Sequence, residues 1–333
     1  MHVSWVSGVP YAYALLRHAR RVGEAQYAAA AEAVLDHIAG NLTPGGTFWG
    51  QWTATRGWTW GWHPDHSRLH ARTLADATLF LVRASELVLK QHKPSWAAAV
   101  TSNLNVVLRT QREDGALPAA HHVETGEAVS WEGTAGMAWI PALVAAGHLD
   151  AARRAGAYYR GFETWYGAAE DVDLAPTSED GYGALMAFVA LEDWEAARRA
   201  ADWLLTFRYT YDVAFSPQTL LGHYGFRTRG ADQASPANQH LHAFGLIAFR
   251  ELVALARATG DEYYLERANE NLECFRQFVA RGDGDFNAQR GMVSERYYQT
   301  DCFQAKGMLL TLSHAWSAGV LLLACEDALE LGP

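Results

Sequence analysis

The chain has 333 residues, of which half are hydrophobic and 19% are charged, and its formal net charge is −10. This length and composition are typical of a folded globular protein and exclude a disordered chain. The acidic balance and the lack of a basic face argue against nucleic acid as a partner, because phosphate contacts need clustered lysines and arginines. The three cysteines form no CxxC pair, so neither a disulfide framework nor a zinc–thiolate site is indicated.

Helical periodicity recurs along the whole chain, in two kinds of segment. Residues 179–191 and 239–259 are apolar nearly all round, which is typical of helices buried at the centre of a protein. Residues 194–207 and 261–280 have one charged face, which is typical of outer helices. In chain order we expect helices at residues 10–20, 24–40, 67–89, 96–110, 134–146, 150–165, 179–191, 194–207, 239–259, 261–280 and 308–330.

The breaks between these helices alternate between short and long, which predicts a tandem array of helical hairpins. Antiparallel hairpins place every tight turn at one end of the molecule and every long loop at the other. Six inner helices and five outer ones predict an all-α fold, a single (α/α)6 toroid domain over residues 1–333. The alternative is an open helical solenoid. We favour the closed ring because loops rich in Trp, His and acidic residues would then surround one pit.

The loop at residues 45–73 contains five tryptophans among glycines, followed by several histidines, and has no helical period. Aromatic faces beside hydrogen-bonding side chains are what a sugar-binding cleft needs. Trp58, Trp60, Trp62 and His63 are therefore predicted to contact a sugar. The alternative is that these tryptophans only cover the end of the helical domain.

Acidic residues in the other long loops are candidates for catalysis. Hydrolysis of a glycosidic bond needs two carboxyl groups, one protonated and one ionised. We expect Asp180 to act with Glu132 or Glu295 as the acid and base. Capping of a helix after Ser178 is an alternative role for Glu179 and Asp180, and an ion pair with Arg296 is an alternative for Glu295. The full candidate set is Glu132, Glu179, Asp180, Glu295 and Asp301.

Side chains suited to substrate binding lie in the same loops. We expect Trp131 to stack on a sugar ring together with the tryptophans of the first loop. Hydrogen bonds to sugar hydroxyls are expected from His122, Tyr182, Arg229, Gln239, His240, Arg296 and Tyr297. Arginines in these loops suggest a uronate or an oligosaccharide as the carbohydrate substrate.

Metal and cofactor chemistry find no support in the sequence. His66 and His70 stand four residues apart, but the glutamate of an HExxH zinc site is absent. No Gly-rich phosphate loop, GxSxG elbow or Cys–His nucleophile pair stands out. No apolar run has membrane-spanning length, and no signal-peptide pattern is present. We therefore expect a cytoplasmic protein with no metal, no cofactor and no membrane partner.

The hairpin pattern and the loop motifs GWTWGWHPDH, SWEGTAGMAW, TSEDGYG and SERYYQTD together resemble the six-hairpin, (α/α)6-toroid superfamily of carbohydrate-active proteins. That superfamily includes glycoside hydrolases, unsaturated-uronyl hydrolases, polysaccharide lyases and sugar 2-epimerases. The resemblance implies a carbohydrate substrate, and we expect a glycoside hydrolase. One alternative is an epimerase or lyase in which His240, His122 or Tyr297 transfers protons. Another is a non-catalytic carbohydrate-binding or scaffold module.

Overall fold

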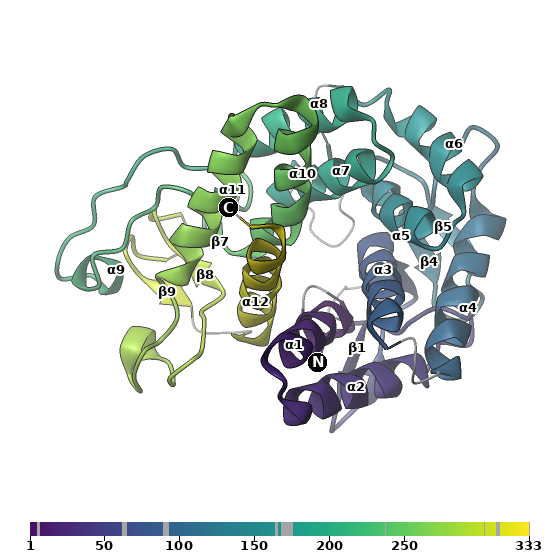
Figure 1. Ribbon diagram of the computed structural model, residues 1–333, viewed down its shortest axis with the longest axis horizontal. Coiled ribbons are helices and arrows are strands. Elements are labelled where there is room, and N and C mark those ends of the chain that lie inside the picture. The colour runs from purple at the N-terminus through teal and green to yellow at the C-terminus, as the bar shows by residue number, and fades with distance from the viewer. Residues whose placement is uncertain are drawn as a thin grey trace.

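The structure is a computed structural model that describes residues 1–4, 7–61, 65–88, 93–163, 166–167, 176–236, 238–302, 304–310 and 314–332. Its helices form a closed ring of two layers (Figure 1). Successive inner helices pack against one another, and the last of them packs against the first. The predicted (α/α)6 toroid is thus confirmed, and the open solenoid is excluded. The six inner helices among the described residues are α1 (Val9–Val22), α3 (Ala71–Leu87), α5 (Trp139–Ala145), α7 (Ser178–Ala190), α10 (Phe249–Thr259) and α12 (His314–Leu331).

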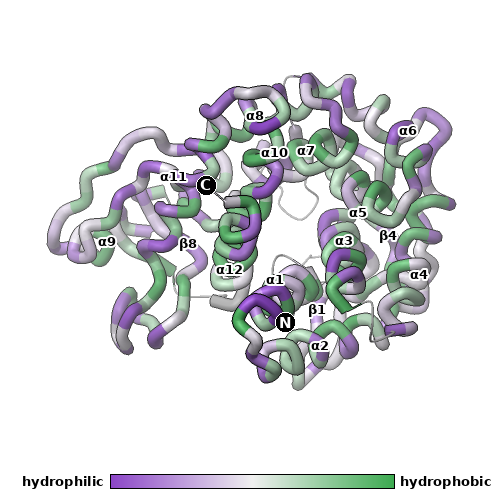
Figure 2. The backbone as a smooth tube through the Cα atoms, viewed as in Figure 1, coloured by the Kyte–Doolittle hydropathy of each residue, from purple (hydrophilic) through white to green (hydrophobic). Residues whose placement is uncertain are grey.

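The outer helices pair with the inner ones through tight turns. Gly23 and Gly260 make such turns in a left-handed conformation, with φ of 76° and 71°, which favours glycine over residues with a Cβ atom. Outer helices bury one small-residue stripe and expose a charged face, and Figure 2 shows hydrophilic residues along the outer rim. The outer helices are α2 (Ala25–Ala39), α4 (Pro94–Thr110), α6 (Leu149–Tyr159), α8 (Trp194–Leu205) and α11 (Glu262–Arg276).

The two ends of the ring differ in their connections. The long loops lead into the N-terminal ends of the inner helices, and we call this side the loop end. The tight turns follow the C-terminal ends of the inner helices, and we call the opposite side the turn end. Short 3₁₀ segments, η2 (Ala135–Ala138) and η3 (Phe244–Ala248), open α5 and α10 at the loop end. Two further short segments lie within the loops, α9 (Leu220–His223) and η4 (Asp285–Asn287).

The long loops also contain short antiparallel strands, which the sequence did not predict. Residues 67–70, 239–243 and 308–310, expected in helices, lie outside them. The strands form three sheets with the orders β1-β2, β3-β4-β5 and β6-β7-β8-β9, and the second and third sheets join loops that are far apart in the sequence. The strands are β1 (Gln51–Thr53), β2 (Gly57–Thr59), β3 (Arg68–His70), β4 (Ala120–His122), β5 (Ala128–Ser130), β6 (Asp232–Gln233), β7 (Leu241–His242), β8 (Arg296–Tyr297) and β9 (Leu309–Leu310).

These strands fix where the inner helices begin. Strand β3 runs directly into α3, and its residue Leu69 lies opposite His121 of β4. Strand β7 leads into η3 and α10, and Leu241 lies opposite Tyr297 of β8. Backbone hydrogen bonds between distant loops therefore hold the first turns of the inner helices in register. Among the described residues, none of the helices combines the length and hydrophobicity that a bilayer crossing requires.

Candidate functional site

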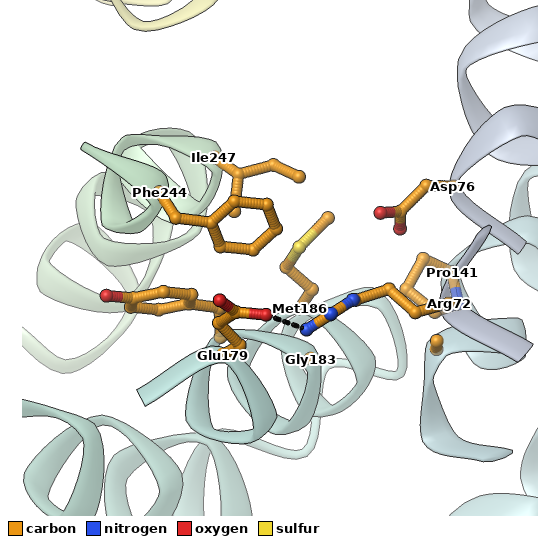
Figure 3. A pocket seen from close by; sticks show the side chains of 10 residues that line it. Arg72, Asp76, Pro141, Glu179, Gly183, Met186, Phe244 and Ile247 are labelled. Atoms are coloured by element: carbon orange, nitrogen blue, oxygen red, sulfur yellow. Dashed lines mark ion pairs between the residues drawn. The ribbon is translucent and has the colours of Figure 1, made fainter. Parts of the chain in front are cut away.

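A cavity on the ring axis at the loop end collects side chains from four inner helices (Figure 3). Arg72 of α3 extends across it, and its Nη1 lies 2.5 Å from Oε2 of Glu179 on α7. The two side chains are 8% and 12% exposed, so this is a nearly buried ion pair. The free space that remains is about 20 Å³, which holds about one water molecule. The cavity is lined by Arg72, Asp76, Ala138, Pro141, Glu179, Tyr182, Gly183, Met186, Phe244 and Ile247.

Helix capping at the loop end explains how the ion pair is positioned. Thr177 is the N-cap of α7, and its Oγ1 accepts a hydrogen bond from the Asp180 backbone N–H. The same hydroxyl donates to Asp180 Oδ2 at 2.7 Å, so Asp180 completes the cap. Glu179 projects from the same first turn into the axial cavity instead. On the facing helix, His70 caps α3 by accepting from the backbone N–H of Arg72.

Two buried histidines lie on and beside β7, behind the cavity-lining residue Phe244, whose ring packs against His242. The Nε2 atom of His242 lies 3.1 Å from Oγ of Ser178, and the rings of His240 and His242 are 5.7 Å apart. Burial lowers the pKa of His242 to about 4, helped by the charges of Arg296 and Arg72 and opposed by Asp232. Burial, then His242 and Arg296, lowers the pKa of His240 to about 2. Both imidazoles are therefore uncharged at neutral pH.

Aromatic rings enclose His242. Its ring is nearly parallel to those of Phe244 and Trp316, with centroids 6.2 Å and 6.0 Å away. Phe244 also lines the axial cavity, with the Arg72 guanidinium 5.4 Å from its ring centroid. The Nε1 atom of Trp316 is buried and has no hydrogen-bond partner among the described residues. An aromatic surface and an unused donor thus meet beside an uncharged base.

A fully buried ion pair lies next to the strand that carries His242. Arg208 donates to both carboxylate oxygens of Asp232, at 2.7 Å and 2.8 Å, and both side chains are at most 1% exposed. Asn271 donates to Asp232 as well. Gly245 lies against this pair, because a Cβ atom there would approach Asp232 Oδ2 to 2.0 Å. Only glycine lets η3 begin this close to the carboxylate.

The predicted carboxylates separate into different surroundings. Of the five, only Glu179 lines the axial cavity. Asp180 serves the helix cap, and Glu295 accepts from Nε of Arg296 at 3.1 Å. Glu132 and Asp301 are exposed on loops, where Asp301 accepts the backbone N–H of Lys306. The expected pairing of Asp180 with Glu132 or Glu295 therefore has no counterpart around this cavity.

The predicted tryptophans mostly pack on protein side chains. Trp58 stacks on His37 of outer helix α2, with ring centroids 4.9 Å apart, and Trp60 stacks on His66 at 4.1 Å. Trp131 donates from Nε1 to the carbonyl of Thr110 at the C-terminal end of α4. These contacts favour packing over sugar stacking at these positions. Trp62 and His63, also predicted to bind sugar, lie outside the described residues.

Among the predicted hydrogen-bonding residues, Tyr182, His240 and Arg296 come together near His242. Tyr182 lines the cavity, and Arg296 is close enough to lower the pKa of both histidines. The others have partners elsewhere. Arg229 pairs with Glu270 on the outer surface, and the hydroxyl of Tyr297, whose ring is buried among phenylalanines, donates to a backbone carbonyl. The Nδ1 of His122 accepts from the Glu124 backbone, and the Gln239 amide donates to Pro236.

Sequence reasoning missed Arg72, Asp76, Phe244, Trp316 and His242 as site residues. For the first two a signal was present. Arg72 and Asp76 stand four residues apart and are the charged residues in the N-terminal half of an inner helix, so they share one face. Polar residues on a buried helix face need a partner or a function. In the described part of the chain, no group of three or more His, Cys, Asp or Glu side chains is arranged to hold a metal ion.

Comparisons with known proteins find similar folds but no sequence family. No family model and no curated protein matches the sequence. A crystal structure of D-mannose isomerase matches all of this chain and 87% of its own, with a TM-score of 0.62 and 13% identity. Cellobiose 2-epimerase from Spirochaeta thermophila matches with a TM-score of 0.59, 11% identity, 99% of this chain and 87% of its own. A family 76 glycoside hydrolase from a bovine Bacteroides thetaiotaomicron strain matches with a TM-score of 0.60 and 13% identity, over 99% of this chain and 70% of its own. These similarities establish the toroid fold.

Proposed function

We propose that the protein is a carbohydrate-active enzyme that interconverts an aldose and a ketose by proton transfer. The observation that carries this proposal is that the uncharged His242, with His240 next to it, packs against Phe244, which lines the axial cavity together with Arg72. A general base must be unprotonated at the working pH, and burial, which lowers the pKa of His242, keeps its imidazole in this form. D-Mannose isomerase and cellobiose 2-epimerase, each matched by this chain over 87% of its own length, have similar folds, which supports a sugar as substrate.

In the proposed reaction, His242 removes the proton from C2 of the open-chain aldose. The C2–H bond breaks, and its electron pair forms the C1–C2 double bond of an enediol while charge moves to the carbonyl oxygen. Arg72 stabilises this oxygen, because a guanidinium in a water-poor site is a strong donor to a developing oxyanion. The O2–H proton then moves to O1, which leaves the negative charge on O2, and His242, whose proton has exchanged with solvent, protonates C1, which yields the ketose. One base on one face of the sugar is sufficient for this sequence, whereas 2-epimerisation needs a second proton donor on the opposite face.

The free volume of the cavity is too small for a sugar, so binding of the substrate requires the Arg72–Glu179 ion pair to open. With about 20 Å³ free, a sugar enters only if the Arg72 side chain leaves Glu179 and rotates toward the loop end. We therefore propose that Glu179 holds the Arg72 side chain in place until an oxygen atom of the substrate takes over as the partner of Arg72. Phe244 and Trp316 would pack against the sugar carbons, and Trp316 Nε1 would donate to a hydroxyl.

A glycoside hydrolase is the second candidate, and one observation favours it. Asp76 and Glu179 both line the axial cavity from facing helices, so two carboxyl groups flank one space. Two such groups across a scissile bond are what glycoside hydrolysis needs. We rank it second because Glu179 is engaged by Arg72 at 2.5 Å.

Incubation with free aldoses and with oligosaccharides in D₂O separates the two reactions. Isomerisation through an enediol replaces the C2 hydrogen by deuterium, which NMR detects as loss of the H2 signal together with the appearance of a ketose. Hydrolysis releases new reducing ends and leaves H2 in place. We expect exchange with the wild type and none with His242→Gln, whereas His148→Gln, a change at the turn before α6, serves as a matched control with full exchange. Reducing-end release without exchange would establish the hydrolase. If neither exchange nor reducing-end release is observed, both proposed reactions are wrong.

A further inference from the structure

The cavity at the loop end has a counterpart at the turn end. A second cavity of about 420 Å³ lies between the C-terminal halves of α3, α5 and α7, the whole of α10 and the last turn of α12. Met186 and Pro141 line both cavities, so they form the partition between them. A volume of this size is in the range of small-molecule sites. The face of α3 that follows the axis carries Arg72 and Asp76 in the first cavity and Leu79 and Arg83 in the second.

Three arginines and one glutamate line this second cavity. Arg250 is engaged by carboxylates, with Asp327 at 2.9 Å and Glu330 at 3.0 Å. Arg83, in contrast, reaches the carboxylate of Glu251 only at 3.8 Å, which is too long for a hydrogen bond. Among the described residues, the guanidinium of Arg83 therefore has a counter-ion nearby but no hydrogen-bonded one.

Glu251 is the second unusual group in this cavity. The residue is 6% exposed, and its Oε2 is buried with no hydrogen-bond partner among the described residues. Burial raises the pKa of this carboxyl, opposed by Arg83 of α3 and Arg250 of α10 and supported by Asp327 of α12. A carboxyl donates a hydrogen bond only in its protonated form, which a raised pKa favours, so a protonated Glu251 would stand beside Arg83 as a second donor facing one space.

Helix dipoles account for one of the arginines but not for Arg83. Cations near helix C-termini are stabilised by the unpaired carbonyl groups there, and Arg257 lies in the last turn of α10. Its Nη2 donates to the carbonyl of Leu331. Arg83 lies a full turn before Leu87, where α3 ends. Its guanidinium lies over the Phe80 ring, 5.2 Å from the centroid, and near Glu251, which leaves its N–H groups available to an acceptor in the cavity.

We propose that the turn-end cavity is a second binding site, which takes a small organic anion with a carboxylate or phosphate group. The oxyanion would accept hydrogen bonds from Arg83 and Glu251, and the apolar part of the ligand would rest on Leu79, Val144 and Val189, which line the same space. The proposal does not depend on the reaction at the loop end, because it uses none of the residues that only the first cavity contains.

Calorimetric titration of the full chain tests this site with probes that are not sugars, namely inorganic phosphate, glycerol phosphate and malonate, with glycerol as the uncharged control. We expect saturable binding of at least one anion and none of glycerol. Arg83→Gln should weaken binding about tenfold or more, equivalent to ~1.4 kcal/mol. Arg153→Gln, a change at a side chain that is 70% exposed, is the matched control and should bind as the wild type does.

Two further variants separate loss of the site from loss of the fold. Val144→Phe fills the cavity without altering charge and should abolish anion binding while the circular dichroism spectrum stays unchanged. Glu251→Gln keeps a donor at this position, so anion affinity should remain and vary with pH only through ionisation of the anion itself, whereas in the wild type it should also fall as Glu251 ionises. If Arg83→Gln weakens the binding of inorganic phosphate but not of malonate, the group that this site recognises is a phosphate. Equal binding by Arg83→Gln and wild type, or no saturable binding of any anion, would overturn the proposal.

Discussion

At the loop end of the ring axis, the ion pair of Arg72 and Glu179 closes at 2.5 Å and leaves about 20 Å³ free. At the turn end, Arg83 and Glu251 stand 3.8 Å apart beside a space of about 420 Å³. Helix α3 supplies the arginine of each pair, whereas Glu179 comes from α7 and Glu251 from α10, and Met186 and Pro141 line both cavities. A tight buried pair must be broken to admit a ligand, whereas a loose pair already has donors available. The two ends therefore suit different ligands, and the first three of the following predictions test this difference.

The largest effect is expected from removing the ion pair at the loop end. Arg72→Met combined with Glu179→Met replaces the pair by apolar side chains, which is often neutral for stability or even stabilising. The rate of C2 hydrogen exchange should fall about 10²–10³-fold or more, because the donor to the developing oxyanion is lost. NMR of an aldose in D₂O measures the exchange.

The matching double variant at the turn end, Arg83→Met with Glu251→Met, should keep the exchange rate within about threefold, since a change of less than ~0.7 kcal/mol in barrier is expected for residues outside the site. Equal loss in both double variants would mean that the two cavities act as one site.

The second prediction concerns the stability of the two ends. Asp232→Asn breaks the fully buried pair with Arg208 and should lower the free energy of unfolding by about 3–5 kcal/mol. Glu330→Gln at the turn end removes a partner of Arg17 and Arg250, but this carboxylate is 55% exposed. Water screens such pairs, so we expect a loss of at most about 1 kcal/mol. Urea denaturation of both variants measures the difference, and similar losses would contradict the contrast in burial.

The third prediction is that the two ends respond to pH in opposite directions. The pKa of His121 and of His242 is lowered to about 4 from an ordinary value of 6.5. The unfolded chain therefore binds more protons between these values, and the fold loses stability as pH falls from 6.5 to about 4, by ~3 kcal/mol for each histidine.

Glu251 has a raised pKa, so its sign is reversed. The folded protein holds this proton more tightly than the unfolded chain does, and stability is lost as pH rises through the pKa of the folded state. Glu251→Gln should therefore unfold at higher urea concentration than the wild type at about pH 8, with the gap closing toward pH ~4. A constant gap across this pH range would show that Glu251 does not titrate in the fold.

The ring was predictable because the properties that define it are local. Apolar and charged faces repeat at the helical period, and breaks alternate in length, so each hairpin can be inferred from its own residues. The strands were not predictable, since β3 pairs with β4 and β7 with β8 across long intervals, and two or three residues carry little periodic signal. Residues 239–243 read as helix for this reason.

The site itself depended on details of one helical turn. Ser178 was expected to cap α7, but Thr177 does so, and the cap uses Asp180. This shift leaves Glu179 to face the axis, at about 100° from its neighbour around the helix. The sequence analysis included both acids and favoured Asp180. It could not distinguish them, because both lie in the first turn, where acidic residues are favourable in any case.

The smallest effect on sugar binding is expected from the tryptophan that most strongly suggested a carbohydrate site. Trp58 is partly buried and stacks on His37 of α2 at 4.9 Å, and its strand neighbour Trp52 meets the same ring edge-on at 5.1 Å. Trp58→Ala should therefore lower the free energy of unfolding, with about 1 kcal/mol from the lost aromatic contact alone. Sugar affinity, measured by saturation-transfer NMR, should stay within about twofold of the wild type.

Trp316→Phe is the comparison that decides whether this distinction holds. The change keeps an aromatic ring against Phe244 and His242 but removes the buried Nε1 donor. If this donor binds a sugar hydroxyl, affinity should fall by about 1–2 kcal/mol, which is larger than the effect of deleting the whole Trp58 side chain. A stronger effect of Trp58→Ala would place the sugar over the tryptophan loop and away from the ring axis. The indole count of a loop is then a poor guide to a sugar site unless the partner of each indole is known.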